Sequence, residues 1–190
     1  MRRASLAAYV VAGAGAVAAV TIGLFFWIDQ PWGTVNDLAL LVMTAAIAPF
    51  MLAFWELGGR TPTALALAAQ AAGWLAVATW CATQALMIVG AVSFDYYAPA
   101  TGAFAIGSVA LAVIGLWIAG ASLLAGPWLT TLRWPGVVIG LGFVVFTFGL
   151  LRGGVDTGWT YLGGVFYEFG FPIWAFLMGR QLVARLRADP

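Results

Sequence analysis

The sequence lacks histidine and lysine altogether, and it contains one cysteine, Cys81. Without histidine, neither a haem held by two histidines nor a histidine-ligated metal site can form. Without lysine there is no amine for a Schiff base to retinal or pyridoxal phosphate. A lone cysteine makes no internal disulfide or redox pair, and Ser-His-Asp and Cys-His catalysis are excluded with the histidines. We therefore expect no cofactor and no bound metal, and we favour a non-enzymatic function.

Charged residues are also scarce. They make up 8% of the 190 residues, against about 25% in a soluble domain, whereas 64% are hydrophobic and the mean hydropathy is +1.01. A net charge of +1 leaves no basic face for phosphates, so no nucleic-acid partner is expected. Apolar runs of about 20 residues are long enough to cross a hydrocarbon core about 30 Å thick. The composition indicates an all-α, polytopic integral membrane protein whose surroundings are a lipid bilayer.

Six apolar segments predict a single domain over residues 1–190, built as a six-transmembrane-helix bundle. The expected spans are 4–28, 38–57, 63–92, 103–126, 136–151 and 161–183. Pro49 and Pro172 fall inside the second and sixth spans. Because proline has no N–H and its ring clashes with the preceding turn, we expect a structural kink at each of these two positions.

Arginine sets the expected orientation. Six spans place most arginines on the side that carries both termini: Arg2, Arg3, Arg60, Arg133, Arg180, Arg185 and Arg187. The opposite side holds Arg152 and the aspartates Asp29, Asp37, Asp95 and Asp156. Since cytoplasmic loops carry the excess of positive charge, we expect both termini in the cytoplasm. We expect a multi-pass protein of a cell membrane, the inner membrane in a bacterium.

The last apolar segment contains the one acid set well inside a long apolar run, Glu168. It lies about 10 Å along the helix from Tyr161 at about 1.5 Å per residue. An ionised carboxylate there costs about 3 kcal/mol or more, so it needs a partner, water or a proton. Pro172 lies four residues later and removes the helical partner of the Glu168 carbonyl. A costly acid and a broken backbone bond coincide.

Other polar side chains fall at a similar depth, one in each of the remaining spans. They are Thr21, Thr44, Gln84, Ser108 and Thr147. If they converge, they form a polar layer around Glu168, with Arg152 above it. The candidate ligand-binding residues are therefore Glu168, Gln84, Arg152, Ser108, Thr147 and Thr44.

Two other interpretations of these residues stay open. The hydroxyls can bond back to their own helices, which leaves Glu168 as a structural tie to Gln84 or Arg152. The acid can also reach water at the lipid edge. Aromatic residues of the same segment, such as Tyr167 and Trp174, can line a pocket or form the outer aromatic belt and ordinary packing.

Small residues recur at helical spacing in the first apolar segment. They are Ala8, Ala12, Gly15, Ala16, Ala19 and Gly23. Such a face lets helix backbones approach closely, either inside the bundle or against a partner subunit.

Two functions follow from these patterns. The first is binding or carrying a small or lipophilic molecule at an outer-half site around Glu168. The alternative is a non-catalytic accessory subunit of a larger membrane complex. An enzyme has less support, because one buried acid lacks a second catalytic group. In size, span number, cytoplasmic termini and small-residue first helix, the chain resembles the substrate-binding components of energy-coupling-factor vitamin transporters. That architectural resemblance transfers no site residues.

Overall fold

The computed structural model describes residues 2–28, 31–57, 63–93, 95, 97–125 and 129–188, and these contain helices and turns but no strand. The first five helices are α1 (Arg2–Ile28), α2 (Trp32–Leu57), α3 (Ala64–Ile88), α4 (Gly102–Leu124) and α5 (Arg133–Gly153). The last span comprises α6 (Gly158–Gly164), the π-helical η2 (Val165–Gly170) and α7 (Phe171–Ala188). Six of the described helical segments are long and apolar enough to cross a membrane, as expected.

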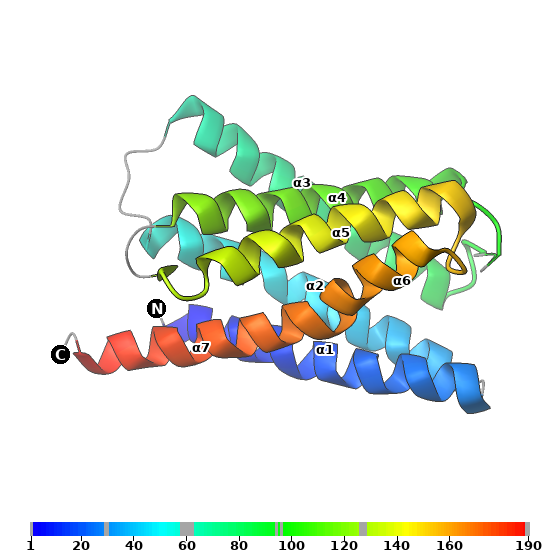
Figure 1. The fold of residues 1–190 in the computed structure, drawn as a ribbon, viewed down its shortest axis with the longest axis horizontal. Coiled ribbons are helices and arrows are strands. Elements are labelled where there is room, and N and C mark those ends of the chain that lie inside the picture. The colour runs from blue at the N-terminus through cyan, green and yellow to red at the C-terminus, as the bar shows by residue number, and fades with distance from the viewer. Residues whose placement is uncertain are drawn as a thin grey trace.

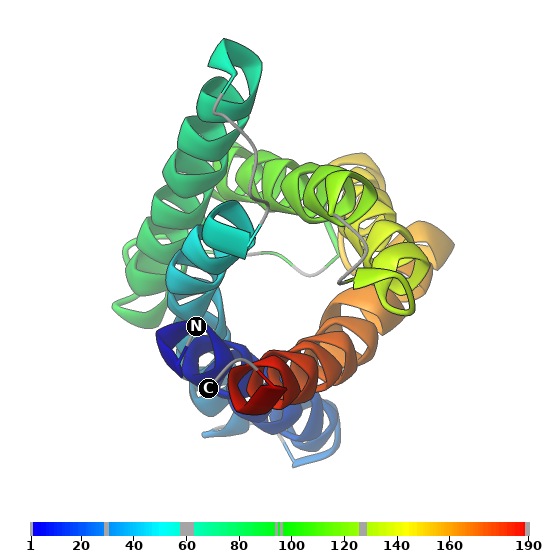
Figure 2. The same ribbon diagram turned by 90° about the vertical axis from the view of Figure 1, so that its left-hand side faces the viewer.

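The six spans form a ring in chain order (Figure 2). Each span packs on the next one along the chain, and α1 closes the ring against α7 and η2. Both termini lie at one end of the bundle, which we call the termini end (Figure 1). The opposite end, where α1 finishes and α2 begins, is called the far end. Asp29, Arg60 and the side chains of Arg2 and Arg187, on which the expected orientation partly depends, lie outside the described residues.

Aromatic side chains fill the ring at the level of α7. Phe50 and Trp174 meet edge-to-face with ring centroids 5.7 Å apart, and Phe143 meets Phe171 in the same way at 5.3 Å. All four side chains are buried. Edge-to-face pairs add attraction beyond the apolar area that they bury. The indole N–H of Trp174 also donates to the Leu132 carbonyl at 3.0 Å, so this part of the core is both packed and hydrogen-bonded.

Glycines bring the α4 and α5 backbones into contact. A Cβ on Gly140 would overlap the carbonyl oxygen of Gly115, and one on Gly115 would approach the carbonyl oxygen of Gly140. The small residues of α1 divide between two faces: Ala8 and Gly15 are buried, whereas Ala16 and Gly23 are exposed. Packing inside the bundle therefore uses some of these small residues and leaves others exposed. Docking of a partner on the exposed part stays a prediction.

Several helix bounds differ from the expected spans. Helix α2 begins at Trp32 rather than 38, so Asp37 belongs to a helix and not to a loop. Helix α3 ends at Ile88 rather than 92, where Gly90 takes a left-handed conformation with φ of 72°. Helix α5 begins at Arg133 rather than 136, because proline is tolerated in the first turn, where no N–H partner is needed. Gly126, the expected end of the fourth span, lies outside the described residues.

The last span changes helix type just before Pro172. In η2 the bonding is wider, and the N–H of Phe171 donates to the carbonyl of Phe166, five residues back. Since Pro172 cannot bond the Glu168 carbonyl, a π-helical stretch is one way to absorb the missing bond. Figure 1 shows α6 leaving the line of α7 at this point. Pro49 lies inside the continuous helix α2, and a kink there stays a prediction.

Candidate functional site

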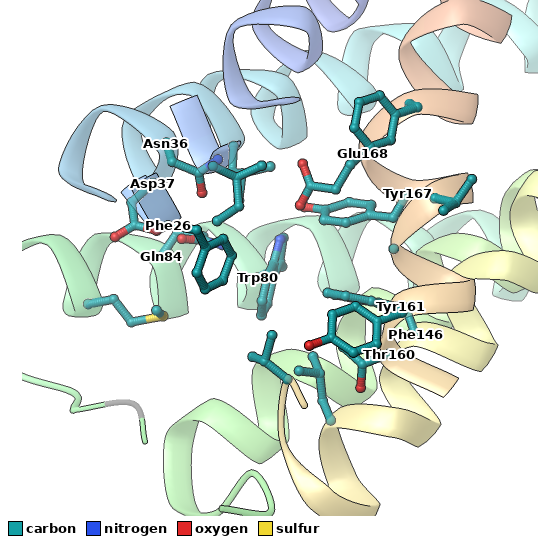
Figure 3. Close-up of a pocket in the computed structure, with 18 of the residues that line it drawn as sticks. Phe26, Asn36, Asp37, Trp80, Gln84, Phe146, Thr160, Tyr161, Tyr167 and Glu168 are labelled. Atoms are coloured by element: carbon teal, nitrogen blue, oxygen red, sulfur yellow. The ribbon is translucent and has the colours of Figure 1, made fainter. Parts of the chain in front are cut away.

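A cavity of about 330 Å³ lies at the far end of the bundle (Figure 3). All six spans contribute to it. Its lining includes Ile22 and Phe26 of α1, Asn36, Asp37 and Leu40 of α2, Trp80, Gln84 and Met87 of α3, Phe104 of α4, Phe146 and Leu150 of α5, and Thr160, Tyr161, Gly164, Val165, Tyr167, Glu168 and Phe169 of the last span.

The turn between α5 and α6 fixes one wall of the cavity. Thr157 caps α6 by accepting from the N–H of Thr160 at 3.2 Å, and the Thr160 hydroxyl donates to the Gly154 carbonyl at 2.7 Å. Helix α6 then lies so close to α5 that a Cβ on Gly163 would overlap the backbone of Phe146. This approach lets the Phe146 and Tyr167 rings stack, with centroids 5.2 Å apart.

Four buried polar atoms in this cavity have no hydrogen-bond partner among the described residues. They are the indole nitrogen of Trp80, Oε1 of Gln84, the hydroxyl of Tyr167 and Oε2 of Glu168. The Trp80 N–H and the Tyr167 hydroxyl interact electrostatically but lie outside hydrogen-bond geometry. Since some 90% or more of buried polar groups are paired, and an orphan costs about 1–3 kcal/mol, this concentration calls for a ligand or water.

Two short sequence spacings produce that concentration. Trp80 and Gln84 are four residues apart on α3, so they share one helix face. Tyr167 and Glu168 are adjacent in η2, and both line the cavity. In Figure 3 the Trp80 indole stands between Gln84 on one side and Tyr167 and Glu168 on the other. π-Helical turns are frequent at functional sites, where they redirect side chains.

The Asp, Glu, Lys and Arg residues that line the cavity are all acidic. Glu168 and Asp37 carry carboxylates, and no arginine is among the described lining residues. Burying an ionised carboxylate without a counter-ion costs several kcal/mol. Asn36 is already committed, because its Nδ2 donates to the Ala18 carbonyl of α1 at 2.8 Å. The described residues contain no group of three or more histidine, cysteine, aspartate or glutamate side chains that could hold a metal ion.

The structure brings together two of the residues expected at the site, Glu168 and Gln84. The hydroxyls of Thr44 and Ser108 instead donate to Leu40 and Phe104 of their own helices, each at 2.8 Å. Thr21 likewise donates to the Val17 carbonyl at 2.8 Å. These three hydroxyls therefore bond back to their own helices.

Thr147 and Arg152 also lie elsewhere. The Thr147 hydroxyl donates to the Ser108 carbonyl at 2.8 Å and so ties α5 to α4. Arg152 is exposed at the end of α5, where its guanidinium lies 5.8 Å from the centroid of the Phe148 ring. The expected pairing of Arg152 with Glu168 is not formed, since Oε2 of Glu168 has no partner among the described residues.

The cavity also holds Trp80, Asn36 and Asp37, which were not expected there, and Tyr167, which was expected only as one of several aromatic residues able to line a pocket. Two of them had a usable signal. Trp80 precedes Gln84 by one helical turn, and Tyr167 is the neighbour of Glu168. Asp37 was assigned to a loop, because the polar segment before residue 38 hides the start of α2.

No protein-family model, curated protein or solved structure matches the chain. The chemistry of the cavity therefore carries the functional argument.

Proposed function

We propose that the protein binds or carries a small lipophilic molecule in the far-end cavity, with Glu168 as the polar anchor. In this proposal both termini are cytoplasmic, and the cavity lies in the outer half of a cell membrane. The observation that carries it is the gathering of four unpartnered buried polar atoms in one cavity. A folded protein gains nothing from such atoms unless something else pairs with them.

The size and lining of the cavity favour a small, largely apolar ligand. Ligand pockets span about 300–1,000 Å³, and this cavity of about 330 Å³ is at the lower limit. Apart from its few polar groups, the wall consists of aliphatic and aromatic side chains. Such a wall orients a ligand through one polar end and buries the rest in apolar contacts.

A lateral route from the lipid supports the lipophilic character of the ligand. Phe26 of α1 and Tyr161 and Phe169 of the last span line the cavity, yet they are 64%, 60% and 51% exposed. Helix α1 packs on η2 and α7, whereas α6 packs on α5. The bend at η2 therefore carries α6 away from α1, and the cavity opens between them on the bundle surface. In this proposal the opening is the route by which the ligand enters from the lipid.

Cavity filling tests the proposal with propylbenzene as a neutral probe. Gly164 lines the cavity, and a Cβ there meets Phe146 only at 3.6 Å, so Gly164→Leu places its side chain in the available space. Propylbenzene should raise the melting temperature of the wild-type protein in nanodiscs saturably, and Gly164→Leu should abolish that rise. Gly158→Leu is the matched control, because nothing lies within 4 Å of a Cβ at Gly158. Equal stabilisation of both variants would refute binding in the cavity.

A further inference from the structure

The cavity holds acidic side chains and no basic one among its described lining residues. Glu168 and Asp37 are its titratable carboxylates. Arg152 lies over the Phe148 ring, and Arg133 donates to the Ala125 carbonyl at 2.8 Å. An anionic ligand would meet two acids and no base among the described lining residues. Charge complementarity therefore selects a neutral or a cationic ligand.

The inventory of unpartnered atoms favours a ligand rich in donors. Oε1 of Gln84 only accepts hydrogen bonds, as Oε2 of Glu168 does when the carboxyl is ionised, and the Tyr167 hydroxyl both accepts and donates. The Trp80 N–H is the single obligatory donor of the four. A ligand that offers only carbonyl oxygens would leave both carboxylate and amide oxygens unpaired. A protonated amine has three N–H donors and no acceptor.

Aromatic rings supply a second attraction for a cation. Trp80 is 3% exposed and Tyr167 is 1% exposed, and Phe146 stacks on Tyr167. A cation within about 6 Å of an aromatic ring centroid is attracted by the ring quadrupole, and tryptophan and tyrosine are the better partners. The effect is larger at buried rings, such as those of Trp80 and Tyr167.

We propose that the ligand is a lipophilic organic ammonium ion, whose nitrogen lies at the Glu168 carboxylate beside Trp80 and Tyr167 and whose apolar part fills the cavity toward Phe26 and Tyr161. The proposal rests on the proposed binding function and names its ligand class.

Two probes of the same shape isolate the charge. Phenethylammonium and propylbenzene differ in one group, NH₃⁺ in place of CH₃. The binding of each to the wild-type protein in uncharged phosphatidylcholine nanodiscs is measured by titration at neutral pH. The ammonium should bind more tightly than propylbenzene. Glu168→Gln should lower the affinity for the ammonium about tenfold or more, since an interaction with a charged group is worth that factor, and should change the propylbenzene affinity less than about twofold.

Asp95→Asn is the matched control, because Asp95 is an exposed loop acid at the same end of the bundle and does not line the cavity. It should leave both affinities unchanged. The comparison of the two probes on the wild-type protein needs no variant. It therefore tests the preference for a cationic ligand even if Glu168→Gln does not fold.

The outcomes separate the two proposals. If propylbenzene binds in the cavity at least as tightly as phenethylammonium, or Glu168→Gln lowers both affinities equally, the cationic ligand is refuted and the binding function stands. If neither probe binds the wild-type protein, or both bind Gly164→Leu as tightly as they bind the wild type, both proposals fail.

Discussion

Two glutamines and two tryptophans distinguish the ends of the bundle. Gln70 and Gln84 are both buried on α3, and Trp174 and Trp80 are both buried in the ring. At the termini end, Gln70 accepts from the indole N–H of Trp117 at 3.1 Å. At the far end, Oε1 of Gln84 has no partner among the described residues.

The tryptophans repeat the contrast, because the N–H of Trp174 donates to the Leu132 carbonyl, whereas that of Trp80 interacts with the Tyr167 hydroxyl outside hydrogen-bond geometry. Residues of the same type and similar burial therefore differ in their hydrogen bonds between the two ends of the bundle. The Gln70 oxygen and the Trp174 N–H take part in hydrogen bonds between segments, although Nε2 of Gln70 has no partner among the described residues. Oε1 of Gln84 and the N–H of Trp80 form no such bond in the part of the chain that the structure describes.

Replacing glycine by leucine should give the largest difference in the free energy of unfolding between the closely packed region and the cavity. Gly140→Leu would drive a side chain into the α4 backbone at Gly115, so it should lower the free energy of unfolding by about 3 kcal/mol or more. Gly164→Leu should cost about 1 kcal/mol or less, since cavity space accepts the side chain. Reversible unfolding in mixed micelles measures both values. Similar losses in the two variants would remove the distinction.

The glutamine pair should give an intermediate effect. Gln70→Leu leaves the Trp117 N–H without its acceptor, so it should destabilise the protein by about 1–3 kcal/mol. Gln84→Leu removes an acceptor that has no donor and should cost less than about 0.5 kcal/mol, or should stabilise. The same unfolding titration compares them. A loss at Gln84 as large as that at Gln70 would mean that Gln84 is satisfied in the folded protein.

The tryptophan pair compares the two regions through the loss of a single indole N–H group. Trp174→Phe and Trp80→Phe remove the same volume, and only the first breaks a hydrogen bond of the structure. The difference between the two losses should be about 1 kcal/mol, with Trp174→Phe the less stable protein. Trp80→Phe keeps an aromatic ring at the cavity, so far-ultraviolet circular dichroism should stay that of the wild type. Equal losses would contradict the contrast.

The six long apolar helices were predictable from the sequence, and the direction of a side chain around its helix was not. Counting residues placed Glu168, Gln84, Thr44 and Ser108 at one level, and six long apolar helices followed from composition. Whether a side chain at that level faces the ring interior depends on which neighbours its helix meets. For Thr44 and Ser108 the hydroxyl bonds its own helix, a choice that a short side chain makes locally wherever no partner is offered.

The π-helical stretch illustrates the same limit. Pro172 marked where the helix had to break, but the sequence did not indicate whether a kink, a bulge or a loop would result. Nor did the sequence indicate that Trp80 of the third span would lie opposite Tyr167 and Glu168. That juxtaposition results from the packing of α6 on α5, which depends on a glycine contact at Gly163.

The closure of the ring by its first and last spans has a consequence for assembly. The other spans whose backbones pack extensively on each other are adjacent in the chain, so those contacts close short loops and cost little chain entropy. The contact of α1 with α7, where Gly15 meets Pro172, joins segments separated by most of the sequence. Since the cavity is lined by α1 and by η2, it does not exist in a partly synthesised chain. It is completed when the sixth span enters the membrane and the open arc of five helices becomes a ring.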